Sequence, residues 1–183
     1  MPTPILNHVP GMIKNQGQII ESFGKDCTGQ INYQFNQQGF RGILDFDFMP
    51  EYAFFGCSLV FGIGVTEKET FPYLFDRSQN YGLAGSYNNR DVMTVLETFL
   101  KSDLYSNQTK IAVVWHSRDA ECLKDFYLKL KSYNIIHFYC GERLPHDNCY
   151  VTPVNADYDV SGTHYGRKSH RLLWKTLYYL FQQ

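Results

Sequence analysis

The sequence lacks the features that mark several large functional classes. Its 183 residues contain no block of basic residues and carry a formal net charge of −1, so the electrostatic footprint of a nucleic-acid-binding protein is missing. No apolar run reaches the roughly 18 residues of a transmembrane helix, and residues 1–24 lack a basic segment followed by an apolar one. We therefore expect a cytoplasmic protein without a membrane or nucleic-acid partner.

Metal-binding and redox motifs are also missing. The five cysteines are odd in number and form no Cys-x-x-Cys pair, which argues against zinc ribbons and dithiol redox chemistry and favours reduced thiols. Four histidines lack metal-ligand spacing, and we interpret them as structural or surface residues: His8, His137, His146 and His170. The sequence therefore predicts no metal site.

The composition is that of an ordinary globular protein, with 44% apolar and 19% charged residues. The length fits one domain, and the 16% aromatic content predicts a core rich in rings. Residues 1–30 are polar, contain three prolines and show no periodicity, so we expect an irregular arm there. Residues 31–183 are then expected to form a single domain.

Apolar periodicity along residues 31–183 alternates between two kinds. Short apolar or alternating runs predict strands near residues 31–35, 53–58, 79–82, 110–115, 134–140 and 150–152. Apolar stripes at helical spacing predict helices within 88–100, 120–130 and 168–181. Strand–helix alternation of this kind predicts parallel βαβ units, and hence an α/β fold built as a three-layer α/β/α sandwich around a mostly parallel sheet.

The stretch from Ala53 to Gly64 carries the first candidate site. A buried strand ends at Gly56-Cys57-Ser58 and a glycine-rich loop follows, which would place the Ser58 hydroxyl at the carboxyl edge of the sheet. Backbone N–H groups after such a turn can face a developing negative charge. Two alternatives stay open: Cys57 could be the attacking group, or the stretch is a buried strand with an incidental serine.

Other loops after strands carry further candidates. Gly85 follows one strand, His116 and Ser117 follow another, and the last loop contains Asp157, Asp159 and His164. A serine, a histidine and a carboxylate at one sheet edge are the parts needed for nucleophilic acyl transfer. His116 could bind a ligand or serve as a structural residue, and Ser117 could also cap the following helix. Arg41 could clamp a loop near the site, but we favour a solvated surface charge.

Together these motifs resemble the SGNH (GDSL-type) hydrolases over residues 31–181. Gly56-Cys57-Ser58 before Phe61-Gly62 is similar to the first block of that family, and Asn80-x-Gly82-x-x-Gly85 is similar to the second. His164-Tyr165-Gly166 resembles the final block, and the turn at residues 36–42 resembles a lead-in of many members. The resemblance implies a flavodoxin-like sandwich and a serine hydrolase that needs no cofactor.

The resemblance also implies a role for each candidate. Ser58 would be the nucleophile and His164 the general base, while the N–H groups of Ser58 and Gly85 would bind the oxyanion. The family's third block carries an asparagine donor, but here Ser117 stands at about that position. The family's aspartate precedes the histidine by three residues, where this chain has Ser161, so Asp159 is the expected substitute, with Asp157 as the alternative.

The resulting expectation is an esterase that cleaves a small ester, an O-acyl group on a carbohydrate or lipid, through an acyl-serine intermediate. Loss of one oxyanion donor typically lowers the rate about a hundred- to thousandfold. The alternative is therefore a catalytically weak or inactive protein that keeps the fold for binding or for a structural role. The sequence does not indicate an oligomeric state.

Overall fold

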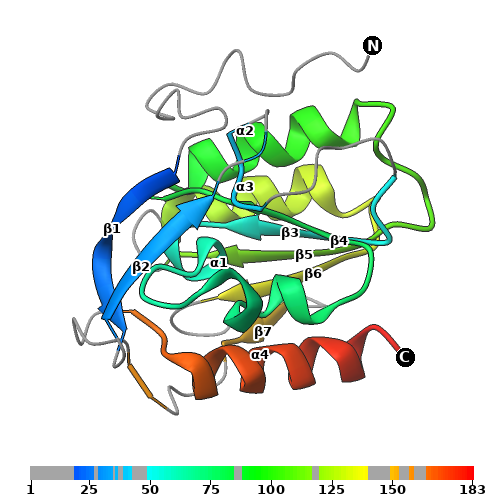
Figure 1. Ribbon diagram of the computed structural model, residues 1–183. Coiled ribbons are helices and arrows are strands. Elements are labelled where there is room, and N and C mark those ends of the chain that lie inside the picture. Colours follow the sequence, from blue (N-terminus) through cyan, green and yellow to red (C-terminus); the bar gives the residue numbers. More distant parts are fainter. Residues whose placement is uncertain are drawn as a thin grey trace.

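A computed structural model of the chain describes residues 19–26, 29–34, 36, 39–42, 49–84, 88–116, 120–139, 149–152, 157–158 and 164–183. In these residues a sheet of five parallel strands runs through the centre, and helices pack against it (Figure 1). The α/β fold class predicted from the sequence is confirmed.

The five strands lie in the order β4-β3-β5-β6-β7, and every neighbouring pair is parallel. Their bounds are β3 Tyr52–Gly56, β4 Ser78–Gly82, β5 Lys110–Trp115, β6 Ile135–Tyr139 and β7 Cys149–Val151. Every residue of β3 and β6 is buried, as is β5 after its first residue. Strands covered on both faces need continuous apolar runs, which explains why these segments were recognisable from the sequence.

Three longer helices connect or follow the strands: α2 Asn89–Leu100, α3 Ala120–Leu130 and α4 Arg167–Leu180. The short elements are α1 Ser58–Phe61 and the 3₁₀ turns η1 Glu67–Glu69 and η2 Pro72–Leu74. The Asn88 side chain accepts a hydrogen bond of 2.8 Å from the Arg90 N–H, so Asn88 is the cap of α2. Thr66 is the N-cap of η1, and its N–H donates to the Glu69 carboxylate at 2.9 Å in a capping box.

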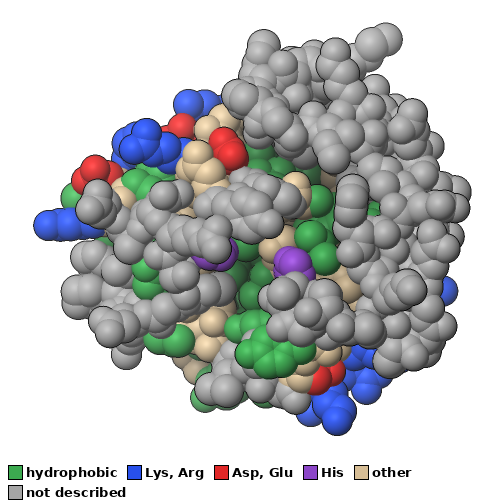
Figure 2. All heavy atoms as spheres, turned by 90° about the vertical axis from the view of Figure 1, so that its left-hand side faces the viewer, with side chains coloured by type: hydrophobic (Ala, Val, Ile, Leu, Met, Phe, Trp, Pro, Cys, Tyr) green, Lys and Arg blue, Asp and Glu red, His purple; other side chains and the backbone are tan. Residues whose placement is uncertain are grey.

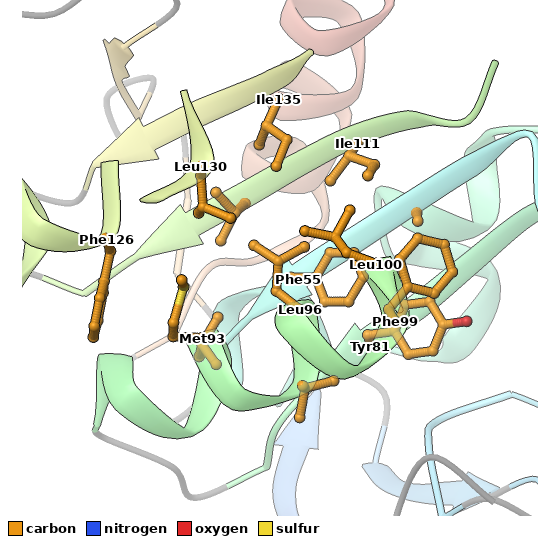
Figure 3. Packing of buried hydrophobic residues seen from close by; sticks show 14 of the residues in the cluster. Phe55, Tyr81, Met93, Leu96, Phe99, Leu100, Ile111, Phe126, Leu130 and Ile135 are labelled. Atoms are coloured by element: carbon orange, nitrogen blue, oxygen red, sulfur yellow. The ribbon is translucent and has the colours of Figure 1, made fainter. Parts of the chain in front are cut away.

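Each face of the sheet buries its own hydrophobic cluster. Phe55, Ile111 and Ile135 point toward α2 and α3 and meet Leu96, Phe99 and Leu130 there (Figure 3). The alternate residues Phe54, Val114 and Phe138 point the other way and pack with Leu173 and Leu177 of α4. Figure 1 shows the same division, with α2 and α3 on one side of the sheet and α4 on the other. Burying one such large apolar side chain contributes about 1.5–3 kcal/mol, so these two clusters anchor the helices.

A separate antiparallel hairpin precedes the sheet. It consists of β1 Ile19–Asp26 and β2 Gly29–Gln34, with Ile20 opposite Tyr33. The expectation of an irregular arm over residues 1–30 is therefore wrong for residues 19–26 and 29–30, which pair in this hairpin. β2 covers most of the strand predicted near residues 31–35, whereas residues 19–26 show no apolar alternation that would predict β1.

None of the helices in the described part of the chain is both long enough and apolar enough to cross a bilayer.

Candidate active site

Ser58 is the first residue of α1 and follows β3 after only Cys57. The Cys57 carbonyl accepts the N–H groups of Val60 and Phe61, each at 3.0 Å, whereas the N–H groups of Ser58 and Leu59 lie too early in the helix for an internal acceptor. Ser58 is partly exposed and Cys57 is only 4% exposed. A reagent can therefore reach the hydroxyl more readily than the thiol, which favours Ser58 over Cys57 as the attacking group.

Two glycines let α1 approach the sheet closely. A Cβ added to Gly82 of β4 would lie 2.2 Å from the Phe61 nitrogen, and one added to Gly56 would lie 2.4 Å from Val60 Cγ2. Gly62 ends α1 in the left-handed conformation at φ 81°, and its N–H donates to the Ser58 carbonyl at 2.9 Å. These glycines fix how closely the short helix that carries Ser58 lies to the sheet and in which direction the chain leaves it.

Polar side chains from outside hold the carbonyl end of α1. Asn80 of β4 donates to the Val60 carbonyl at 2.9 Å, and its own oxygen accepts the Gly82 N–H. Arg41 donates to the carbonyls of Phe61, Gly62 and Val65. Arg41 is only 2% exposed, so our interpretation of it as a solvated surface charge is wrong. Burial lowers the pKa of its guanidinium to about 10, which leaves it charged at neutral pH.

The β1–β2 hairpin is attached to the same loop through Tyr33. The Tyr33 hydroxyl accepts the Gly64 N–H at 2.9 Å, and its ring lies 5.2 Å from the Phe61 ring. The Arg41 guanidinium carbon lies 4.7 Å from the Tyr33 ring centre, a cation–π distance. In Figure 1 the hairpin lies beside the edge of the sheet at which β3, β5 and β6 end.

His164 lies close before α4, at the same edge of the sheet. Its neighbour Tyr165 pairs with Tyr158 in an isolated antiparallel bridge, and the Tyr165 hydroxyl lies 3.4 Å from Thr152 Oγ1, just past the end of β7. Figure 2 views this edge and shows histidine side chains at the surface. Among the four described histidines, His116 and His164 are partly exposed, whereas His137 and His170 are buried.

Asp157 caps α4 from outside the helix. Its carboxylate accepts the Lys168 N–H at 3.0 Å and the Ser169 N–H at 2.8 Å, and it also contacts the Ser169 hydroxyl at 2.9 Å. Partial burial acts to raise the pKa of Asp157, but these hydrogen bonds outweigh it and hold the pKa below its ordinary value. Because both oxygens serve the helix terminus, Asp157 is poorly suited to orient a catalytic histidine.

Gly85, Ser117 and Asp159 lie outside the described residues. The backbone just before Ser117 is held firmly, because Asn89 of α2 donates to the His116 carbonyl and accepts the His116 N–H, each at 2.9 Å. This contact fixes the end of β5 relative to the start of α2. Ser58 and His164 are thus the described members of the predicted site, and the structure brings both to the carboxyl edge of the sheet.

His170 was interpreted from the sequence as a structural or surface residue, and the structure shows that it is buried. It lies on α4, is 1% exposed, and its Nδ1 accepts the Phe71 N–H at 3.3 Å. Burial, reinforced by the charge of Arg41, lowers the pKa of His170 to about 3, so the ring is neutral at physiological pH. Its spacing from Leu173 and Leu177 follows the buried stripe of α4, a pattern that could have indicated its burial.

A cleft of about 490 Å³ runs along β4 and the turn before it. Its described lining includes Arg41, Glu67, Tyr73, Gln79 and Asn80, but neither Ser58 nor His164. The residues that the structure describes contain no group of three or more metal-ligating side chains. Among the described residues, the edge of the sheet offers the Ser58 hydroxyl, the His164 imidazole and backbone N–H groups.

Comparison with known proteins adds no relative from which a function could be transferred. No protein-family model, curated protein or solved structure matches this chain.

Proposed function

We propose that the protein is a serine hydrolase of the SGNH type that cleaves a small ester. The observation that carries this proposal is the position of Ser58, partly exposed at the start of a short helix directly after the inner strand β3. β4, the next strand along the chain, lies on one side of β3, and β5, the strand after it, lies on the other side of β3. Parallel sheets bind ligands at such a change of direction, outside the carboxyl ends of the strands.

The same strand order supports the finer fold assignment. Numbered along the chain, the sheet strands follow the order 2-1-3-4-5, which is that of flavodoxin-like folds. Helices on both sides of the sheet fit a three-layer α/β/α sandwich of this type (Figure 1). The proposed active site therefore lies where this architecture commonly places one.

The proposed reaction proceeds through an acyl-enzyme. His164 takes the proton of Ser58 as the serine oxygen attacks the ester carbonyl, and the N–H groups of Ser58 and Gly85 bind the oxyanion. The C–O bond to the alcohol breaks as His164 returns the proton to the leaving oxygen. Water then attacks the acyl-Ser58 ester with the same assistance from His164, which releases the carboxylic acid and regenerates the serine.

Asp159 remains the proposed carboxylate partner of His164. Asp157 is the less favoured alternative, because its carboxylate already binds the N–H groups of α4. Asp159 is bonded to Tyr158, and His164 is bonded to Tyr165, the residue with which Tyr158 pairs. This closeness along the chain to the Tyr158–Tyr165 pair supports Asp159 as the carboxylate that orients His164.

The proposed substrate is an O-acyl ester of a carbohydrate or lipid, as the resemblance to the family implies. One observation favours the alternative of a weak or inactive SGNH-fold protein: β5 is followed by His116-Ser117 where the family has its asparagine donor. The two proposals differ in whether Ser58 is activated.

A fluorophosphonate probe tests this difference, because it forms a covalent adduct with an activated nucleophile and leaves an ordinary serine unmodified. We expect mass spectrometry to find one adduct on the wild-type protein, at Ser58, and none on Ser58→Ala. Cys57→Ala is the matched control, since it alters the adjacent buried side chain and should still be labelled. A folded wild-type protein without an adduct would favour the inactive alternative, and an adduct at Cys57 would overturn the assignment of the nucleophile.

A further inference from the structure

The segment of residues 62–71 joins the two halves of the proposed site. It begins where α1 ends, so its first residues are covalently connected to the helix that carries Ser58. It ends at η2, where it packs against the first turns of α4. We call these residues the bridging segment. Arg41 donates hydrogen bonds at its beginning, and His170 accepts a hydrogen bond at its end.

The Arg41 guanidinium donates hydrogen bonds to several carbonyls at the start of the bridging segment. Its Nη1 donates to the Phe61 and Gly62 carbonyls, and its Nη2 donates to the Val65 carbonyl at 2.6 Å. The guanidinium lies against the rings of Tyr33 and Phe61, at 4.7 and 5.2 Å from their centres. A rigid planar fork with several donors can hold carbonyls on two sides of a turn, which a lysine ammonium cannot do with the same geometry.

At its other end the bridging segment is attached to α4 by polar contacts and by stacking. His170 Nδ1 accepts the Phe71 N–H at 3.3 Å, and the two rings are stacked with centres 5.9 Å apart. Arg167, in the first turn of α4, forms an ion pair of 2.5 Å with Glu69. His170 Nε2 has no hydrogen-bond partner among the described residues. Nδ1 is thus the ring nitrogen that holds the bridging segment, together with the stacking on Phe71.

The start of α4 is in turn fixed to the loop that carries His164. Asp157 accepts the N–H groups of Lys168 and Ser169, and the Asp157 carbonyl accepts the Gly166 N–H at 3.1 Å. Tyr158 pairs with Tyr165, next to His164. The contacts therefore form a continuous path from α1, through the bridging segment, to the backbone beside His164.

We infer that Arg41 and His170 are positioning residues that hold the bridging segment between α1 and α4 and so set the separation of Ser58 and His164. This inference rests on the proposed function, because it assigns a role in that reaction. Neither side chain needs to touch the substrate. A displacement of about 1 Å between reacting groups can cost roughly a hundredfold in rate, so small shifts of the segment are sufficient for a large effect.

The test uses the full-length protein and separates reactivity from folding. The rate constant of covalent labelling at saturating fluorophosphonate reports how well Ser58 is positioned and activated, and the half-saturating probe concentration reports probe binding. The variants are His170→Leu, which removes the acceptor, His170→Asn, which keeps an acceptor near the Nδ1 position, and Arg41→Lys. Leu130→Ala, in the cluster on the opposite face of the sheet, is the control for general destabilisation.

We expect His170→Leu and Arg41→Lys to lower the saturating rate constant about 10- to 100-fold, with the half-saturating concentration changed less than about threefold. His170→Asn should restore most of the rate. Leu130→Ala should lower the melting temperature at least as much and leave the rate of the folded protein within about twofold.

Other outcomes would overturn the inference. If folded His170→Leu is labelled as fast as Leu130→Ala, His170 is only structural. If His170→Asn is as slow as His170→Leu although both are folded, the Phe71 hydrogen bond is not what positions the site. A wild-type protein that is labelled while all variants remain unaffected contradicts this inference alone, whereas an unlabelled wild type removes the proposed function and this inference together.

Discussion

At the scale of single residues, His170 links the site to the acid stability of the fold. In the folded protein its pKa is lowered to about 3, mainly by burial, and in the unfolded chain we expect the ordinary value of about 6.5. Between these values the unfolded chain binds a proton that the folded protein does not. Stability therefore falls as the pH decreases from about 6.5 toward 3, by at most about 1.4 kcal/mol per pH unit from this residue.

Replacement of His170 by asparagine should remove this part of the pH dependence. From pH 7 to pH 5 the wild-type protein should lose about 2 kcal/mol of unfolding free energy more than His170→Asn does. Urea unfolding followed by circular dichroism at both pH values measures this difference. Equal losses in the two proteins would show that His170 is protonated in the folded state at pH 5. The depressed pKa of Asp157 also lowers stability in acid, but it acts equally in both proteins.

At the scale of elements, α4 is held by a cap that comes from outside the helix. Gly166 stands at the cap position and has no side chain, so the Asp157 carboxylate takes the free N–H groups of the first turn instead. The loop between Asp157 and Gly166 is thereby closed at its base, and His164 lies at that base. The helix and the proposed general base therefore share one anchor.

This arrangement assigns different tasks to the two aspartates. Asp159→Asn should lower the rate of Ser58 labelling by the thousandfold or more that is typical for loss of an orienting carboxylate, with little change in stability. Asp157→Asn should instead destabilise the protein by about 1 kcal/mol through the weakened cap, and reduce labelling by no more than about tenfold. Labelling rates and melting curves of both variants decide the assignment. The reverse pattern would show that Asp157 orients His164.

The elements themselves were predictable to different degrees. Buried strands such as β5 and helices with one apolar stripe such as α2 follow from local periodicity, and both were located almost to the residue. The roles of Arg41, Asp157 and His170 depend on contacts with segments far away in the sequence, and no local pattern encodes them. A strand near residues 31–35 was predicted and corresponds to β2, whereas β1 and its antiparallel pairing with β2 were missed, because residues 19–26 show no apolar periodicity. The position of Ser58 was predictable because it depends on a local pattern of a strand, a glycine and a helix start, and its role in catalysis stays a prediction.

At the scale of the whole molecule, the β1–β2 hairpin and the five-stranded sheet meet at the edge where the parallel strands end. The parallel sheet places β3, β5, β6 and β7 with their carboxyl ends on one side, and the β1–β2 hairpin stands beside that edge (Figure 1). Tyr33 connects the hairpin to the loop after α1, because its hydroxyl accepts the Gly64 N–H. Its ring also contacts the Phe61 ring and the Arg41 guanidinium. The hairpin and the Ser58 helix should therefore be coupled in their local stability.

Tyr33→Phe tests this coupling, because it deletes the hydroxyl that accepts the Gly64 N–H and keeps the aromatic ring. A hydrogen bond of this kind contributes about 1 kcal/mol, so amide hydrogen exchange should become about fivefold faster in residues 29–34 and 61–65. Exchange in β5, which opens only with the whole fold, should become faster by no more than the same factor, because global unfolding also breaks this hydrogen bond. Tyr52→Phe is the matched control, because it removes a hydroxyl from the opposite end of β3, where the partner is Lys110. Faster exchange in the hairpin alone would mean that the hairpin and residues 61–65 open independently. The hairpin would then not stabilise the helix that carries Ser58.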